Sequence, residues 1–269
     1  MEHIRELRNR VVKAAFGIAI GMIIGWFVYP YVWHFIEAPY CKIPMSRIGV
    51  AGKGTCSLYV TGIFDAFFLR LQLAFVIAIV VSSPVWLYQF WAFIAPGLYA
   101  RERRWAYYFV GAAVPLFAFG GLLAYFAMTR GLRFLLGLIP HGVTPIITIT
   151  TYLSYAMAML LIFGLAFEMP LVVVLLNLAG LLPHERFRKW RRMIIFAVFV
   201  FAGVATPSPD PLTMLLLAVP CVILVEFAEI FVWANDRRRA RRGDPYALAA
   251  EAAAPLDDAD SSLDVGHRK

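Results

Sequence analysis

Long uncharged, hydrophobic segments alternate along the chain with short segments rich in Arg and Lys. A helix that crosses the hydrocarbon core of a membrane needs roughly 20 apolar residues. Four segments come close to or exceed that length, namely Ala14–Trp33, Leu71–Tyr88, Trp105–Met128 and Tyr152–Leu182. The pattern therefore predicts at least four transmembrane helices.

Two later hydrophobic segments are shorter. Met193–Thr206 and Leu212–Val225 hold 14 residues each, so as helices they would reach about 21 Å across roughly 30 Å of hydrocarbon. We interpret them as two short spans joined by the turn Pro207–Pro211, and we expect a thinner bilayer around them. A re-entrant pair is the alternative. The expected fold class is an all-α polytopic membrane protein with six transmembrane helices, the last two short.

The overall composition agrees with a membrane protein. Apolar residues make up 61% of the chain and charged residues 16%, whereas soluble domains have about 45–50% and about 25%. A soluble globular domain is therefore excluded.

The basic residues are distributed unevenly between the two sides of the predicted bundle. Nineteen of the 25 Lys and Arg lie at the N-terminus, in the loops before Trp105 and Met193, or after the last span. Because basic residues concentrate in cytoplasmic loops, we expect both termini in the cytoplasm and the spans in the plasma (inner) membrane. Residues 1–233 would form the transmembrane domain. Residues 234–269 would form a cytoplasmic tail, first basic and then disordered, whose cluster Arg237–Arg242 binds anionic lipid rather than nucleic acid.

Glycine and proline positions indicate how the helices pack and bend. Gly17, Gly21 and Gly25 recur every four residues on one face of the first span, where another helix can approach closely. We favour packing within the chain over dimerisation through this face. Prolines interrupt most other spans, at Pro84, Pro115, Pro170 and Pro220. Each removes a backbone donor and kinks its helix, which favours a concave bundle.

No enzyme chemistry is visible in the sequence. The five His lie at span ends, in loops or in the tail, and neither H-E-x-x-H nor G-x-S-x-G occurs. We therefore expect no catalytic activity, no metal site and no other cofactor.

The carboxylates are the informative polar groups. Glu168 lies inside the fourth span and is a functional candidate, because a charge within a bilayer is costly; a structural hydrogen bond between helices is the alternative. Glu226 and Glu229 lie near the cytoplasmic end of the last span, where interfacial solvation is the simpler interpretation of Glu229. Glu6 and Glu102 lie among Arg residues on the cytoplasmic rim and fit ordinary ion pairs equally well.

Two of the three cysteines fall in one loop. Cys41 and Cys56 lie in the first external loop, whereas Cys221 lies inside a span. Because the external compartment of most bacteria is oxidising, we predict a Cys41–Cys56 disulfide. Two free thiols are the alternative.

Four segments closely resemble TatC, the multispanning core subunit of the twin-arginine protein translocase. They are His3–Arg10, Ser83–Arg104 (SPVWLYQFWAFIAPGLYARERR), Phe163–Leu176 (FGLAFEMPLVVVLL) and Ala205–Glu226 (ATPSPDPLTMLLLAVPCVILVE). The resemblance implies a signal-peptide receptor and core scaffold that exports folded proteins across the membrane with the proton-motive force. It also implies partners, namely TatA-type and TatB-type single-span subunits, twin-arginine signal peptides and further copies of the chain.

The resemblance also implies roles for individual residues. Signal-peptide binding would fall to Glu6, Phe93, Glu102, Arg103 and Arg104 on the cytoplasmic side. Glu168 would lie on the concave intramembrane face. Single-span partners would dock around Thr206, Asp210 and Met214.

A proton-coupled small-molecule transporter that uses Glu168 is the alternative function. It predicts inverted internal repeats with paired broken helices. No such repeat is visible, since the short last two spans have no counterpart in the first half of the chain.

Overall fold

The computed structural model describes residues 2–41, 58–94, 103–140, 146–178, 182–208 and 210–241. Within these ranges the chain folds into helices, namely α1 (Glu2–Cys41), α2 (Asp65–Val81), α3 (Ser83–Ile94), α4 (Arg103–Gly137), α5 (Ile149–Ala166), α6 (Met169–Leu178), α7 (His184–Ala205) and α8 (Pro211–Arg241). The β pairing found in the same ranges is a single bridge between Tyr59 and Thr148. The predicted all-α fold is confirmed.

Most predicted spans correspond to helices that can cross a membrane. α1, α4, α8 and the continuous α5–α6 stretch are long and apolar enough to do so individually. α2 and α3 meet the same requirement together and are bent by 58° at the break between them. α7 does not meet it, because its first part is charged. These helices provide five spans. The predicted total of six is consistent with the structure if α7 also crosses the membrane.

The last two helices are longer than the apolar segments from which short spans are predicted. α7 has 22 residues and α8 has 31, which correspond to about 33 Å and about 46 Å of helix. The charges that end the apolar segments do not end the helices, because Arg191 of α7 pairs with Glu226 of α8. Local thinning of the bilayer, expected from short helices, therefore no longer follows.

The last helix extends beyond residue 233, where the transmembrane domain is predicted to end. α8 continues to Arg241, so residues 234–241 are helical, and the division between a transmembrane domain and a cytoplasmic tail stays a prediction. Residues 242–269 lie outside the described residues.

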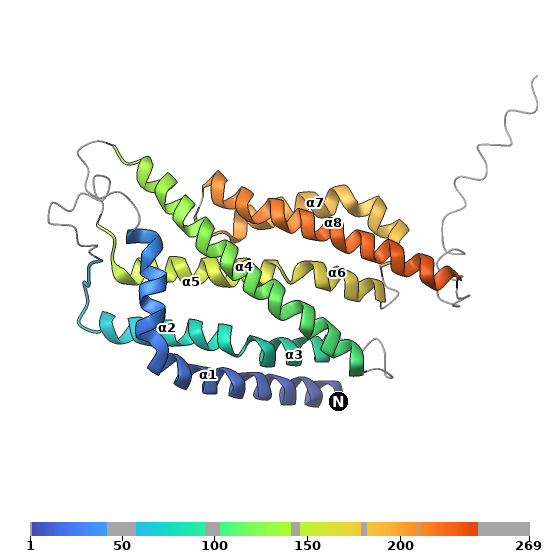
Figure 1. Cartoon of the computed structure of the whole chain (residues 1–269), viewed down its shortest axis with the longest axis horizontal. Coiled ribbons are helices and arrows are strands. Elements are labelled where there is room, and N and C mark those ends of the chain that lie inside the picture. The colour runs from blue at the N-terminus through green and yellow to red at the C-terminus, as the bar shows by residue number, and fades with distance from the viewer. Residues whose placement is uncertain are drawn as a thin grey trace, which may run out of the picture.

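Prolines mark two of the helix breaks. Pro84 follows the break between α2 and α3, and Pro170 follows the turn at Phe167 and Glu168 that separates α5 from α6. Pro115 and Pro220, by contrast, lie inside α4 and α8, which continue past them. α1 also contains two prolines and turns away from its first direction in its second half (Figure 1).

The glycine face of α1 packs against α2 within the same chain. A Cβ placed on Gly25 would lie 2.6 Å from the carbonyl oxygen of Ala74, and one placed on Gly21 would lie 2.9 Å from that of Ala78. Only glycine permits this approach of two helix backbones. The prediction of close packing within the chain is confirmed.

The helix ends fall into two groups (Figure 1). The start of α1, the end of α3, the start of α4, the end of α6 and the end of α8 lie at one end of the molecule. The start of α2, the end of α4 and the start of α5 lie at the other. Residues that are distant in sequence therefore meet at the two opposite ends of the bundle.

Candidate functional site

The helix ends that carry the predicted signal-peptide site lie at the same end of the molecule. Glu6 is in the second turn of α1, Phe93 is at the end of α3, and Arg103 and Arg104 begin α4. These three helix ends lie together (Figure 1). Glu102 lies outside the described residues, and the side chains of Arg103 and Arg104 are likewise outside the description. The topology thus supports a common site, and Glu6 and Phe93 supply its described side chains.

Glu6 already binds a guanidinium group in this structure. Its Oε1 accepts hydrogen bonds from Nη2 of Arg10 at 2.7 Å and from Nε at 3.1 Å. The Glu6 side chain is 43% exposed. The two residues are one helical turn apart, which is the spacing of the ion pair predicted from the sequence. The carboxylate is therefore accessible from solvent, and one of its oxygens is paired with an arginine of the same helix.

Aromatic side chains line the contact between α3 and α4 near this end. The rings of Trp91 and Phe109 stack with centroids 5.5 Å apart, and those of Tyr88 and Tyr107 lie 5.6 Å apart. Phe93 is half-buried beside them. Sequence reasoning identified Phe93 through the family motif but missed Trp91, which lies two residues earlier in the same motif and is completely buried.

Glu168 lies deep in the protein, at the turn between α5 and α6. Its side chain is buried, and neither carboxyl oxygen has a hydrogen-bond partner among the described residues. Its backbone is satisfied, because its N–H donates to Leu165 and its carbonyl accepts from Leu171. A structural hydrogen bond between helices, the alternative considered for this side chain, is not formed to any residue that the structure describes.

The predicted partner-docking residues stabilise the turn between α7 and α8. Asp210 is the N-cap of α8, since its Oδ2 accepts from the backbone N–H of Thr213 at 2.8 Å and its Oδ1 from the Thr213 hydroxyl at 2.7 Å. The Thr206 hydroxyl donates to the carbonyl oxygen of Ala202 at 2.8 Å. Both Thr206 and Asp210 are buried, whereas Met214 is half-buried next to Gly203. The two polar side chains therefore define the shape of the turn instead of presenting free groups to a partner.

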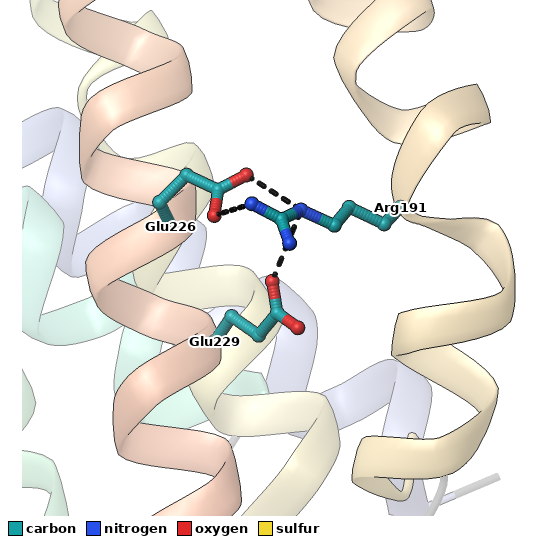
Figure 2. A network of polar contacts seen from close by, with 3 residues as sticks. All are labelled: Arg191, Glu226 and Glu229. Atoms are coloured by element: carbon teal, nitrogen blue, oxygen red, sulfur yellow. Dashed lines mark hydrogen bonds and ion pairs between the residues drawn. The ribbon is translucent and has the colours of Figure 1, made fainter.

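A three-residue ion network joins α7 and α8 (Figure 2). Nε of Arg191 donates to Oε1 of Glu226 at 3.0 Å, while Nη2 donates to the second oxygen of the same carboxylate. Nε of Arg191 also lies 3.6 Å from the carboxylate of Glu229. The interpretation of Glu229 as merely solvated at the interface is therefore wrong. Its partner is far away in sequence, and no local pattern indicates it.

A second polar network holds the connection between α6 and α7. The buried Asn177 donates to Asp236 at 2.9 Å and to the carbonyl oxygen of Leu182 at 3.0 Å. Asp236 also accepts from the backbone N–H of His184 at 2.8 Å, at the start of α7. Asn235 completes the network by donating to Asn177 at 2.9 Å. Sequence reasoning missed these residues, because none of them belongs to a motif that it singled out.

The cysteines are partly described. Cys41 is disulfide-bonded, Cys221 is free and buried, and Cys56 lies outside the described residues. The Cys41–Cys56 pairing thus stays a prediction. Within the described ranges, no group of three or more His, Cys, Asp or Glu side chains is arranged to hold a metal ion.

Comparisons with known proteins agree on one family. The family model of the Sec-independent protein translocase protein TatC matches residues 2–220. A protein of that name from Frankia casuarinae is 51% identical over 95% of this chain and 72% of its own length. Another from Xylanimonas cellulosilytica is 36% identical over 91% of this chain and 87% of its own length.

Solved structures point the same way. A crystal structure of the twin arginine translocase receptor TatC in DDM matches with a TM-score of 0.71 and 30% identity, over 86% of this chain and 99% of that one. A second crystal structure of such a receptor gives a TM-score of 0.67 at 32% identity, over 85% of this chain and 96% of that one. The chain therefore belongs to the TatC family, and it is a membrane-embedded component of the Sec-independent protein translocase.

Proposed function

We propose that the chain is the receptor for twin-arginine signal peptides and the core scaffold of the translocase. The observation that carries this proposal is the exposed Glu6 carboxylate, which binds the Arg10 guanidinium at the end of the molecule where α3 ends and α4 begins. An arginine of a signal peptide replaces Arg10 by making the same two hydrogen bonds. Glu102, next to the start of α4, supplies the second carboxylate.

The chemistry of the site explains a preference for arginine over lysine. A guanidinium is planar and offers two parallel N–H donors to a carboxylate, whereas an ammonium group is a compact point charge. Each exposed ion pair contributes only about 0–1 kcal/mol. The apolar part of the signal peptide therefore adds most of the affinity by burial against the hydrophobic interior of the bundle, on the concave face expected from the sequence.

The orientation follows from the charge distribution. The helix ends near Glu6 carry the basic loops and the basic end of α8, so we place this end and both termini in the cytoplasm, with the spans in the plasma membrane of a prokaryote. Export of folded cargo is driven by the proton-motive force, which supplies roughly 2.3 kcal/mol per charge per 100 mV.

Single-span subunits of the TatA and TatB type dock along α7 and α8. Large apolar side chains on these helices face outward, among them Val204, which is 83% exposed, and Phe196, which is 69% exposed. Such side chains offer an apolar surface to a transmembrane helix of a partner. The turn defined by Thr206 and Asp210 sets the spacing of the two helices at this surface.

The receptor role is tested by crosslinking a photoreactive signal peptide to the membrane-embedded protein. Glu6→Ala combined with Glu102→Ala should reduce crosslinking of an Arg-Arg peptide by about tenfold, to the level of a Lys-Lys peptide, since two bidentate acceptors are removed. Glu185→Ala is the matched control, because Glu185 is an exposed carboxylate at the start of α7. Unchanged crosslinking by the double variant would refute the receptor mechanism.

A further inference from the structure

The contact between α1 and α2 carries an arginine and a tyrosine one helical turn beyond its glycines. The close approach of Gly25 to the backbone of Ala74 sets the register of the two antiparallel helices. One turn further along α1 and one turn back along α2 place Tyr29 opposite Arg70. The guanidinium carbon of Arg70 lies 4.6 Å from the centre of the Tyr29 ring. Helix packing therefore holds this guanidinium on an aromatic face.

Arg70 carries a charge in a helix that is otherwise largely apolar. It is the one basic residue of α2 and lies in the second turn of that helix, where it is exposed. A helical side chain points toward the N-terminus of its helix, so Arg70 extends toward the end of the bundle where α2 starts. A charged group at a membrane-spanning position is costly unless it finds a partner.

The chain offers no free carboxylate to Arg70 at this end of the bundle. Asp65 accepts hydrogen bonds from two backbone N–H groups of the preceding turn, at 3.1 Å and 2.7 Å. Glu37 is bonded to a histidine of α1 at 2.9 Å, and Asp210 caps α8. The segments that follow α1 and α4, residues 42–57 and 141–145, contain no Asp or Glu. A counter-charge must therefore come from outside the chain.

Two exposed aromatic side chains lie beside the arginine. Trp26 and Phe67 precede Tyr29 and Arg70 by three residues in their helices, and their rings meet edge to face with centroids 6.4 Å apart. They are 38% and 54% exposed. Aromatic side chains next to a basic residue are typical of the level of the lipid headgroups. The surroundings of Arg70 thus suit a ligand that is anionic at one end and apolar along its length.

We propose that Arg70 and Tyr29 form a binding site for the phosphate group of an anionic phospholipid, whose acyl chains lie along Trp26 and Phe67. The ring covers one face of the guanidinium and leaves the N–H donors in its plane free. These donors match two phosphate oxygens at once. Charge complementarity and the apolar flank both select a lipid over a free ion. Only the assignment to the external leaflet rests on the proposed orientation of the protein.

The site is tested by native mass spectrometry of the full-length protein in detergent, titrated with phosphatidylglycerol. Arg70→Gln should weaken binding of the tightest lipid by about tenfold, the factor expected for one bidentate charged contact. Arg70→Lys should restore only part of the affinity, because an ammonium group lacks the planar pair of donors. Tyr29→Leu should weaken binding by about threefold through loss of the ring face, whereas Tyr29→Phe should keep it.

Arg133→Gln is the matched control. Arg133 is an exposed arginine near the end of α4, at the same end of the bundle, and no aromatic ring of the described residues stacks on it. Its loss should leave the affinity of the tightest lipid within about twofold, which corresponds to an exposed charge without a built site. Equal losses in Arg70→Gln and Arg133→Gln would overturn the proposal in favour of diffuse attraction.

A measurement on the unaltered protein covers the case in which the Arg70 variants do not fold. A photoreactive phosphatidylglycerol should form adducts at Trp26 or Phe67. Inorganic phosphate that displaces the lipid completely would show an ion site only, and adducts from a single-span subunit in place of lipid would assign the surface to a protein. Either result would overturn the proposal. Signal-peptide crosslinking should be unchanged in Arg70→Gln, so this test and that of the receptor role fail independently.

Discussion

Acidic residues in this protein differ sharply in the groups that surround them. Glu6 binds Arg10 at the surface, Asp210 caps a helix in the interior, and Glu168 is buried without a direct partner among the described residues. A carboxylate in a membrane protein is a functional candidate in general, but the surroundings decide which role it can have. Of these three, Glu6 and Glu168 keep acceptor groups that a ligand could use.

Asp210 should matter first for stability. Asp210→Ala removes the N-cap of α8 and the acceptor of the Thr213 hydroxyl, so the folded state should lose about 1–2 kcal/mol. Thermal unfolding of the purified protein in detergent measures this loss.

Asp210→Asn is the conservative comparison, because asparagine is also a good N-cap. It should recover most of the stability. An Asp210→Ala variant as stable as the parent, yet impaired in binding single-span subunits, would instead identify Asp210 as a direct docking group.

At the scale of helices, packing depends on small residues and on ion pairs between neighbouring helices. The α1–α2 contact needs glycine, because backbone atoms of α2 occupy the space of a side chain. The α7–α8 contact includes the Arg191 network, in which one guanidinium neutralises charge from two carboxylates of α8 (Figure 2). This pairing explains why α8 can continue through Glu226 and Glu229.

The glycine contact gives a matched pair of substitutions. Gly25→Ala places a Cβ 2.6 Å from a backbone carbonyl oxygen, so α1 and α2 must move apart at a cost of about 1–3 kcal/mol. Gly111→Ala in α4 meets nothing within 4 Å and should stabilise its helix by roughly 0.5–1 kcal/mol. Melting temperatures followed by size-exclusion chromatography compare the two. Equal melting temperatures would mean that the helices adjust without strain.

At the scale of the whole molecule, the helix ends form two opposite groups, and the proposed receptor site lies in the group that we place in the cytoplasm. The proposed receptor residues lie where α1, α3 and α4 meet, and the intramembrane carboxyl lies at the break between α5 and α6. A signal peptide bound where α1, α3 and α4 meet can extend its apolar segment toward the break between α5 and α6. The break between α5 and α6 places the polar side chain of Glu168 in the interior of the bundle.

This orientation predicts the behaviour of reporter fusions. Alkaline phosphatase, which requires an oxidising compartment, should be inactive when fused to the C-terminus and active when fused after Ile139, which follows α4. Green fluorescent protein at the same two positions should give the opposite pattern. Active phosphatase at the C-terminus would invert the proposed topology and place the Glu6 site on the wrong side for signal recognition.

The sequence by itself determined the membrane class, most of the spans, the glycine contact of α1 and the family. These properties depend on local composition and short spacing, since apolar length selects a membrane helix and a four-residue repeat selects one helix face. Glu6 and Phe93 were assigned their roles from family motifs, and Glu168 was identified as a carboxyl group inside an apolar segment; both signals are equally local.

Tertiary structure alone decided which distant groups meet. The pairing of Arg191 with Glu226 and the network around Asn177 and Asp236 each join different helices. It also decided the true length of α8 and the burial of Asp210. The physical reason is that the energy of a charge or a polar group depends on the neighbours that packing brings to it, and those neighbours are not encoded in the adjacent sequence.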